Sequence, residues 1–437
     1  MEAKRAASES HTADAKRKAF ESNIPPCKLE ERLSFRLLCS IFSFLDPFEH
    51  ILLFRGCKRF RELARLPAAW PTDVSFFGFP AREFSLSVLG DALRDARKVH
   101  FPSMHAAGAE VPLRWCRAIG QLKHLEFISF VETEITANVM ACFASCSSLR
   151  AVSFDLQTKL CKGACEPLSA LPLTEVRFYR ASVAAGAEES ECASLGMLPL
   201  RSIDINHAPK CFITVALQAS ATIEHASFAA FMSDRDVCAL VGACKRLRTL
   251  SISGGQSLTA VAFRELAKLP LLTALDLRNC VSFGDGAFTA LAACTTLTSL
   301  NFESAYGARA LDLAELASLP RLQSLTLQGL QLSAAHVAQL ARFPHLTTLR
   351  LRAVGLTAKA LAPLKSSIAA LTELDLSWNA IGYDALEPLS RLPLKQLRVL
   401  STNVLDADKA LRALAEAAAA DGELSRATLC SPVVLLE

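Results

Sequence analysis

The chain has 437 residues, of which 51% are hydrophobic and 21% are charged, and its formal net charge is +4. A nearly balanced charge excludes a general polyanion-binding field. We expect no membrane span, because no apolar run approaches the length that one needs, and no Sec-type signal peptide, because no apolar segment follows the first residues. The fifteen cysteines are spread along the chain, which predicts reduced thiols and an intracellular working place.

Residues 1–26 are predicted to be a disordered leader. They are rich in Ala, Ser and charged residues, which cannot offset the entropy lost on ordering, and Pro25-Pro26 closes the segment. Two basic clusters, Lys4-Arg5 and Lys16-Arg17-Lys18, have the spacing of a bipartite nuclear-import signal. A solvated basic tail has the same composition, so both interpretations stay open.

Residues 29–70 predict three short amphipathic helices. Apolar residues recur there at steps of three and four, which is helical spacing. Asp46-Pro47 is expected to end the first helix and begin the second, since proline suits a first helical turn. About forty residues are few for an independent core, so this unit should pack on a partner or on the segment that follows.

The stretch from Leu33 to Pro47, followed by Cys57-Lys58-Arg59-Phe60 and Trp70, resembles an F-box. The family pattern Leu-Pro-x-x-Leu-Leu-x-x-Ile-Phe-Ser-Phe-Leu aligns without a gap, although Ser34 replaces the family's proline and Phe60 its usual tryptophan. The resemblance implies that residues 27–71 bind the Skp adaptor of a cullin-RING ubiquitin ligase. The implied adaptor-binding residues are Leu33, Leu37, Leu38, Ile41, Phe42, Leu45 and Pro47. The alternative is a plain helical cap on the repeats that follow.

Residues 72–437 repeat a short phrase, Leu-x-x-Leu-x-Leu, whose middle residue we call the repeat centre. The positions three before and two after each centre are apolar, and the centres follow one another at steps of 23 to 30 residues. Alternation predicts a short strand with the centre pointing inward, and the period is the leucine-rich-repeat signature. The centres are Val99, Ile128, Val152, Val176, Ile203, Ala226, Leu250, Leu275, Leu300, Leu325, Leu349, Leu374, Leu397 and Ala427.

The predicted fold class is therefore an α/β solenoid, a leucine-rich-repeat horseshoe of about 14 repeats preceded by a small three-helix F-box. A first irregular strand is expected at Val74, one period before Val99. The apolar tail Pro432–Leu436 is expected to cover the last repeat as a C-terminal cap.

The segment between successive strands is alanine-rich and is predicted to be helical. Its clearest copy is Gly286–Ala292, Gly-Ala-Phe-Thr-Ala-Leu-Ala. This phrase, joined to an N-terminal F-box, resembles the GALA-type effectors of plant-pathogenic bacteria, which imitate host F-box proteins. The resemblance implies type III secretion into the host-cell cytoplasm, or into the nucleus if the basic clusters act. The alternative is an endogenous eukaryotic F-box protein that works inside its own cell.

Catalytic chemistry has little support in the sequence, and we expect neither an enzyme nor a cofactor or metal. The phosphate-loop, hydrolase and zincin strings are absent, and the nine histidines lack metal-ligand spacing. Cys146, Cys244 and Cys294 each precede a centre by six residues, which predicts one repeated slot for a buried thiol. Cys280 and Asn379 each follow a centre by five residues and are expected to bond to the turn backbone. Few residues follow the last predicted strand, so any ligase activity is expected to be borrowed from other proteins.

Specificity is expected at the positions one and three residues after each centre, which point out of the sheet. Arg, Tyr and Trp are the residue types that dominate binding hot spots. The predicted target-binding residues at these positions are Arg177, Tyr179, Arg278, Arg350 and Arg352, and Tyr306 and Trp378 are expected just past their strands, at the rim. Mixed charges at these positions favour a protein target over nucleic acid. The sequence thus predicts a substrate receptor of a Skp–cullin–F-box ligase, with a non-catalytic scaffold or inhibitor of the ribonuclease-inhibitor kind as the alternative.

Overall fold

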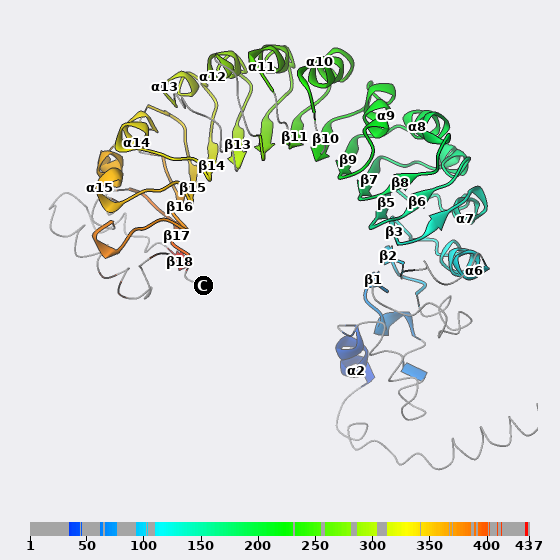
Figure 1. Ribbon diagram of the computed structural model, residues 1–437. Coiled ribbons are helices and arrows are strands. Elements are labelled where there is room, and N and C mark those ends of the chain that lie inside the picture. Colours follow the sequence, from blue (N-terminus) through cyan, green and yellow to red (C-terminus); the bar gives the residue numbers. More distant parts are fainter. Residues whose placement is uncertain are drawn as a thin grey trace, which may run out of the picture. The chain divides into compact units, whose positions relative to one another are not determined.

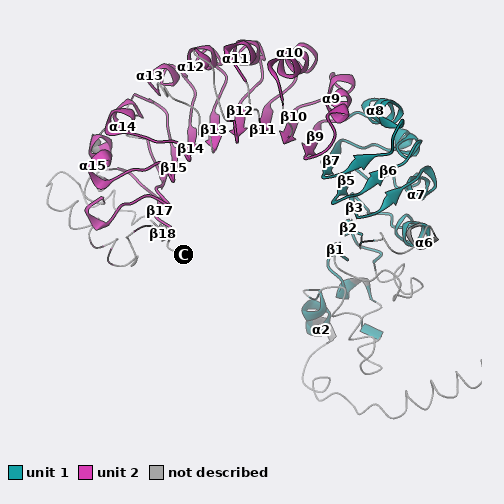
Figure 2. Cartoon of the chain, viewed as in Figure 1, with its two compact units in different colours: residues 1–199 teal, residues 200–437 magenta. Residues whose placement is uncertain are grey.

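The computed structural model describes a large part of the chain. It covers residues 35–43, 45, 62–63, 66–76, 93–101, 103, 110–229, 232–254, 258–280, 286–303, 313–340, 342–366, 368, 370–385, 389, 392–400, 402, 409, 412 and 433–435. The described chain forms two compact units, residues 1–199 and 200–437 (Figure 2). This division lies within the repeats, and the boundaries that we predict at residues 26/27 and 71/72 stay predictions.

Unit 1 is a parallel sheet with helices along one side of its strands (Figure 1). The sheet order is β1 (Asp73–Ser75), β2 (Lys98–His100), β3 (Phe127–Val131), β5 (Ala151–Asp155) and β7 (Glu175–Tyr179). A smaller parallel sheet contains β4 (Glu134–Ile135), β6 (Lys159–Leu160) and β8 (Ser182–Val183). The helices are α2 (Phe35–Phe42), η1 (Pro67–Ala69), α6 (Glu110–Ile119), α7 (Ala137–Ala141), η3 (Glu166–Ala170) and α8 (Glu188–Gly196).

Unit 2 repeats the same strand–helix alternation (Figure 1). Its strands, in sheet order, are β9 (Ser202–Asn206), β10 (His225–Ala229), β11 (Thr249–Ser253), β12 (Ala274–Arg278), β13 (Ser299–Glu303), β14 (Ser324–Gln328), β15 (Thr348–Arg352), β16 (Glu373–Asp375), β17 (Gln396–Arg398) and β18 (Val433–Leu435). Its helices are η4 (Lys210–Phe212), α9 (Ile213–Gln218), α10 (Asp234–Ala243), α11 (Ala260–Leu266), α12 (Ala287–Leu291), α13 (Leu313–Leu316), α14 (Ala334–Leu340), α15 (Ala358–Leu361), η5 (Ala362–Ser366) and η6 (Tyr383–Ala385).

The strand register confirms the predicted repeat centres within each unit. In unit 1, Val74 pairs with Val99, Val99 with Ile128, and Ile128 with Val152. In unit 2 the pairing continues centre to centre from Ile203 to Leu397. These side chains and those two residues later are buried, so each repeat adds one layer to a continuous core. In unit 1 that layer is aromatic, with Phe154 stacked on Phe130 at 6.1 Å and on Phe178 at 5.5 Å between ring centroids.

The last predicted centre is wrong. The strand that pairs with β17 is β18, in which Val434 lies opposite Leu397, whereas Ala427 lies outside the described residues. The tail that we expected to cover the final repeat thus supplies a strand of the sheet itself.

The predicted alanine-rich helices are short but present. Gly286 precedes α12 with φ of 74°, a left-handed conformation that glycine adopts without strain. Alanine also begins other helices of unit 2, with Ala260 at the start of α11, Ala334 of α14 and Ala358 of α15. The three helices predicted over 29–70 are represented among the described residues by α2 and η1.

Candidate functional site

The outward face of the strands carries the predicted target-binding side chains, and β7 of unit 1 presents two of them. Arg177 lies with its guanidinium 5.7 Å from the ring centroid of Phe127 and forms an ion pair with Glu175. Tyr179 is 38% exposed, and the guanidinium of Arg180 lies 5.6 Å from its ring centroid. Phe127 and Arg180 therefore orient the two side chains while leaving them accessible, since stacked cations hold aromatic rings in place.

Arg278 on β12 is neutralised by its own neighbours. Its guanidinium lies 2.8 Å from Oδ2 of Asp276 and 3.4 Å from Oε2 of Glu303. The hydrogen bonds to Asp276 raise the pKa of Arg278 above its ordinary value. Asn301 donates to the same Asp276 at 2.8 Å. A guanidinium between two carboxylates is held rigidly and has little charge left for a partner.

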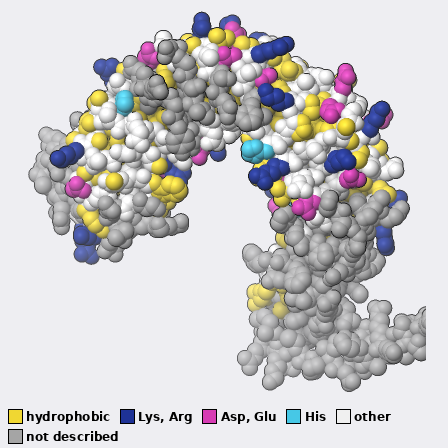
Figure 3. Space-filling model, in the orientation of Figure 1, with side chains coloured by type: hydrophobic (Ala, Val, Ile, Leu, Met, Phe, Trp, Pro, Cys, Tyr) yellow, Lys and Arg dark blue, Asp and Glu magenta, His cyan; other side chains and the backbone are white. Residues whose placement is uncertain are grey.

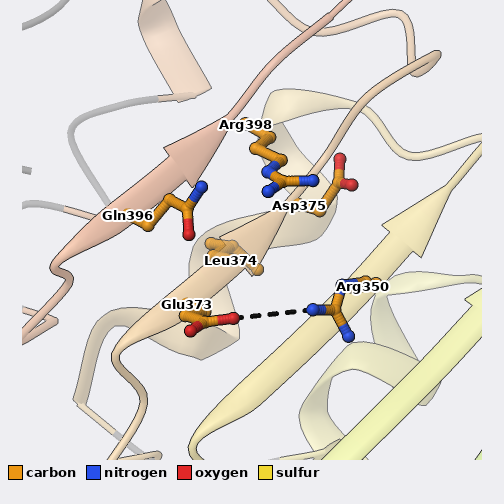
Figure 4. Close-up of a pocket in the computed structure, with 6 residues that line it drawn as sticks. All are labelled: Arg350, Glu373, Leu374, Asp375, Gln396 and Arg398. Carbon is orange, nitrogen blue, oxygen red and sulfur yellow. Dashed lines mark ion pairs between the residues drawn. The ribbon is translucent and has the colours of Figure 1, made fainter. Parts of the chain in front are cut away.

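A small open pocket lies on β15, β16 and β17, the later strands of unit 2 (Figure 4). The register places Arg350, Asp375 and Arg398 in one row across these strands. Nη2 of Arg350 lies 3.5 Å from Oε2 of Glu373, the ion pair drawn in Figure 4. The pocket is lined by Arg350, Glu373, Leu374, Asp375, Gln396 and Arg398.

Arg398 has a neutral acceptor in this pocket. The amide oxygen of Gln396 accepts hydrogen bonds from Nε and Nη2 of Arg398, each at 3.1 Å, in the amide orientation that satisfies both groups. Arg398 has no carboxylate within ion-pair distance among the described residues. An uncharged acceptor leaves the positive charge of a guanidinium uncompensated.

Asp375 connects the pocket to an exposed tryptophan. Only 5% of Asp375 is exposed, and its Oδ1 accepts from the amide of Ser377 at 2.9 Å. Its Oδ2 lies 3.7 Å from Nε of Arg352, whose guanidinium lies 5.7 Å from the ring centroid of Trp378. Trp378 itself is 56% exposed. We call these residues (Arg350, Arg352, Asp375, Trp378, Gln396 and Arg398) the Trp378 surface.

The sequence analysis missed that the backbone is left-handed four residues after nine of the centres. The amide at this position continues the ladder beyond the strand, as in Trp378 N to Leu400 O at 2.9 Å and Asn279 N to Glu303 O at 2.8 Å. The sequence signal was available, because Gly254, Gly329 and Asn279 are residue types that favour this conformation. The members with positive φ are Glu132, Leu156, Arg180, His207, Gly254, Asn279, Gly329, Ala353 and Trp378.

The repeat that contains the Trp378 surface also matches a known sequence family. A family model described as Leucine Rich repeat matches residues 370–390, which hold β16, Trp378 and Asn379. This match agrees with the centre-to-centre strand register and with the strand–helix alternation in both units. The chain is built from leucine-rich repeats.

Solved structures aligned to this leucine-rich-repeat chain share little sequence with it. An internalin (inlF) of Listeria monocytogenes is 16% identical with a TM-score of 0.46, covering 77% of this chain and 90% of that one. A complex of TLR13 with ssRNA13 is 16% identical with a TM-score of 0.46, covering 72% and 50%. An internalin C2 (inlC2) of the same bacterium is 20% identical with a TM-score of 0.32, covering 48% and 78%. A search of curated proteins gave no significant match.

The thiol slot predicted between leucine-rich repeats is confirmed as buried. Sγ of Cys146 lies 3.3 Å from the carbonyl of Gly120, and Sγ of Cys244 lies 3.4 Å from that of Ala216. Burial raises the pKa of Cys146 and Cys244 to about 11 and that of Cys294 to about 12. Such thiols stay protonated at neutral pH and behave as small hydrophobes. Across the described ranges, no group of three or more His, Cys, Asp or Glu side chains could hold a metal ion.

Strands β1 to β3 bring together the residue types of a hydrolase triad. Nε2 of His100 lies 3.3 Å from Oδ1 of Asp73, and its Nδ1 lies 2.8 Å from Oγ of Ser129. Ser129 is 1% exposed, so its hydroxyl cannot reach a substrate. The contact is therefore a polar ladder between neighbouring repeats, and it supplies no accessible nucleophile.

The predicted adaptor-binding residues of α2 fall on two faces. Leu38 and Phe42 are buried within the chain, whereas Leu37 is 47% and Ile41 41% exposed. Leu45 is half-buried. Leu33 and Pro47 lie outside the described residues, as does Tyr306 of the predicted target-binding set. The exposed pair Leu37 and Ile41, one helical turn apart, is the face available to a partner.

Charges on the visible face of the molecule are mixed. In Figure 3, Lys and Arg side chains are scattered among Asp and Glu rather than gathered into a stripe. Nucleic-acid binding usually requires a continuous basic surface. No helix among the described residues is both long enough and apolar enough to cross a membrane.

Proposed function

We propose that this chain is a non-enzymatic binding protein that holds a target protein on the outward face of its strands. The observation that carries the proposal is the accessibility of Arg, Tyr and Trp side chains at strand ends, above all Tyr179 and Trp378. These residue types contribute most to protein–protein affinity. They lie on a parallel sheet whose inward positions are fully used by the core, which leaves the outward face for recognition.

A photo-crosslinking residue at position 179 tests this proposal. In the native host cell, a photoreactive phenylalanine at Tyr179 should give a discrete covalent adduct with a target protein. The matched control is the same residue at Met197, which is 83% exposed and follows α8 on the helix side of unit 1. Equal adducts at both positions would contradict binding by the strand face.

We further propose that residues 27–71 bind a Skp adaptor, so that the chain acts as the substrate receptor of a Skp–cullin–F-box ligase. The F-box resemblance and the exposed pair on α2 support this. The ligase machinery would belong to the adaptor's partners, and the repeats would supply proximity between target and machinery.

The adaptor proposal is tested by pull-down with purified Skp adaptor. The double variant Leu37→Ala with Ile41→Ala should lose capture about tenfold or more, because each buried aliphatic contact contributes about 1.5–3 kcal/mol. Val261→Ala is the matched control, since Val261 is 45% exposed on α11. Undiminished capture by the double variant would remove the adaptor role. An adaptor pull-down that stays empty while Tyr179 still crosslinks a target would favour the scaffold or inhibitor alternative.

We also propose that the protein is a bacterial effector delivered into a host cell by a type III system. The alanine-rich repeat phrase and the composition of residues 1–26 support this. The full chain fused to a calmodulin-dependent adenylate cyclase should raise host cyclic AMP only from bacteria with a working secretion system. Equal cyclic AMP without that system would leave the endogenous eukaryotic alternative.

A further inference from the structure

We propose that the Trp378 surface binds an acidic segment of the target, with an Asp or Glu carboxylate seated in the pocket between Arg350 and Arg398. This inference rests on the proposed function and assigns a partner chemistry to one part of the strand face. The occupant is an extended protein segment that carries the carboxylate next to an apolar side chain. The carboxylate would accept from Arg398, and the apolar side chain would pack on Trp378.

The charge distribution in the pocket is the first step. Two guanidinium groups line the pocket, those of Arg350 and Arg398, together with the carboxylates of Glu373 and Asp375. A third guanidinium, that of Arg352, lies beside the pocket against Asp375. The carboxylates are already engaged, Glu373 by Arg350 and Asp375 by Arg352 and the Ser377 amide. The charge left over lies on Arg398, whose acceptor is the neutral Gln396. An anionic oxygen is the group that completes such a site, since charge-assisted hydrogen bonds are the stronger ones.

The contrast with Arg278 shows why the inference falls on this part of the sheet. Arg278 has the same outward orientation but lies between Asp276 and Glu303. An incoming carboxylate there would have to displace the ion pairs that Arg278 itself forms with Asp276 and Glu303. Glu373 and Asp375 also line the pocket at Arg398, but they pair with Arg350 and Arg352 rather than with Arg398. At Arg398 an incoming carboxylate would displace only a hydrogen bond to an amide, which Gln396 can return to water.

The exposed ring of Trp378 is the second, independent observation. Its φ of +65° belongs to a left-handed position that recurs in other repeats, at Gly254 and Gly329 as well as at Arg180 and His207. The backbone therefore does not distinguish Trp378. A large aromatic side chain left exposed does, because it contributes little to folding and is a residue type of binding hot spots. The guanidinium of Arg352 fixes the ring from one side and leaves 56% of the residue open.

The surface is continuous from the pocket to the ring. Asp375 lines the pocket and contacts Arg352, and Arg352 contacts Trp378. A carboxylate at Arg398 and an apolar side chain at Trp378 can therefore come from one short segment. Aromatic anchors beside guanidinium groups are the composition of binding hot spots.

The test is selection of a random dodecapeptide library, displayed on phage, against the full chain. Enriched peptides should carry Asp or Glu beside a large apolar residue. The affinity of a synthetic selected peptide should fall about tenfold or more when Arg398→Gln removes the charge or Trp378→Gly removes the ring. Replacing the peptide's Asp and Glu by Asn and Gln should cause a similar loss.

Two matched controls keep affinity near the wild-type value. Arg264→Gln removes the same charge from the exposed side chain on α11. Ala353→Gly relieves the same backbone conformation one repeat earlier without removing an aromatic ring. Either control losing affinity as Arg398→Gln does would overturn the proposal.

Tryptophan fluorescence locates the bound peptide. The chain has three tryptophans, and Trp70 and Trp115 are buried, so acrylamide quenching mainly reports Trp378. A bound acidic peptide should protect this emission from acrylamide. The proposal is wrong if a selected peptide binds without protecting Trp378 from acrylamide. It is also wrong if the peptide binds the Arg398→Gln and Trp378→Gly variants as tightly as the wild type.

Other outcomes are also decisive. Selection that does not enrich acidic peptides overturns the inference. A competition experiment also overturns it if a single-stranded oligodeoxynucleotide displaces the bound peptide more effectively than the same unlabelled peptide does. Neither result touches the crosslink at Tyr179 on unit 1, which decides the proposed function separately.

Discussion

Asn379 is a residue whose whole hydrogen-bonding capacity is used by the backbone. Its amide nitrogen donates to the carbonyls of Leu351 at 2.6 Å and Leu376 at 2.8 Å. Its oxygen accepts from the amides of Val354 and Leu356, each at 3.1 Å. One buried side chain thus connects the turns of two successive repeats, as the sequence led us to expect. Cys280 occupies the same position, and its Sγ lies 3.5 Å from the carbonyl oxygen of Arg278 and 4.0 Å from that of Ile252.

Asn379→Ala should therefore destabilise the fold by about 3 kcal/mol, since buried backbone groups would be left without partners. Cys280→Ala, the matched change in another repeat, should cost about 1 kcal/mol or less. Urea unfolding followed by circular dichroism measures both. Equal losses would mean that the hydrogen bonds of Asn379 do not contribute beyond its packing.

The buried thiols predict a loss of stability in alkali. The pKa values of Cys146, Cys244 and Cys294 are raised in the folded chain, to about 11, 11 and 12. An unfolded thiol ionises near pH 8.5, so the unfolded state loses protons first and gains free energy of ionisation. Their contribution is complete below about pH 8.5 and is lost as the pH rises toward the folded pKa values.

The urea midpoint should thus decrease between about pH 8 and pH 10. A triple variant with alanine at the three positions should show a shallower decrease, because it lacks the groups that titrate. A variant whose midpoint falls as steeply as that of the wild type would assign the alkaline loss to other residues.

The burial of the inward strand residues could be predicted from the sequence. For the outward residues the sequence predicted only the side of the sheet, and not their burial or contacts. Leu374 and Leu376 are buried because every strand repeats the same alternation. Asp375 and Ser377 are at outward positions, yet they too are buried. Arg352 of the preceding repeat forms an ion pair with Asp375, and the amide of Leu400 in the following repeat donates to Oγ of Ser377. The contacts between outward side chains depend on the strand register between neighbouring repeats. The sequence of a single repeat does not determine that register.

Helix ends differ more between repeats than strands do. Helix α10 begins with a capping box, in which Ser233 accepts from the amide of Asp236 and Asp236 accepts from that of Ser233. Thr357 occupies the same place before α15 without a side-chain capping bond. The helices are short enough that packing on the strands, rather than capping, decides whether they form.

Ser233→Ala should cost about 1 kcal/mol, the usual contribution of an N-cap hydrogen bond. Thr357→Ala should cost only a few tenths of a kcal/mol, because no such bond is lost. Thermal unfolding of the two variants beside the wild type compares them directly. A loss at Thr357 as large as that at Ser233 would contradict this account of the caps.

The position of the C-terminal strand was predicted wrongly because of an irregular step between strands. The step from Leu397 to Val434 is longer than every earlier step, so extrapolating the period placed the strand at Ala427. Strand length is not the cause, because β16 and β17 also have three residues and their centres were located correctly. Pairing with β17, a long-range contact, decides where β18 lies.

At the scale of a whole unit, stability should follow the number of neighbours that each strand has. In unit 2, β11, β12 and β13 pair on both sides, whereas β18 ends the sheet order and, among the described strands, pairs with β17 alone. Solenoids behave as a sum of repeat and nearest-neighbour terms, so local opening should begin at such an end.

Amide hydrogens of β18 should consequently exchange with solvent faster than those of β12, measured by hydrogen–deuterium exchange and mass spectrometry. Strand β16 is the control, because it also has three residues but pairs with both β15 and β17. Slow exchange in β18 comparable to that of β12 would mean that the end of the sheet is stabilised by something other than its one neighbour.

The row of left-handed residues that follows the strands has a consequence for how such a protein can change over generations. Glu132, Arg180, His207 and Trp378 occupy this row beside glycines and an alanine, so the backbone accepts very different side chains there. A substitution at this position changes what the strand end presents, while the inward leucines of the same repeat keep their contacts. New recognition can therefore arise by single codon changes without passing through an unfolded ancestor.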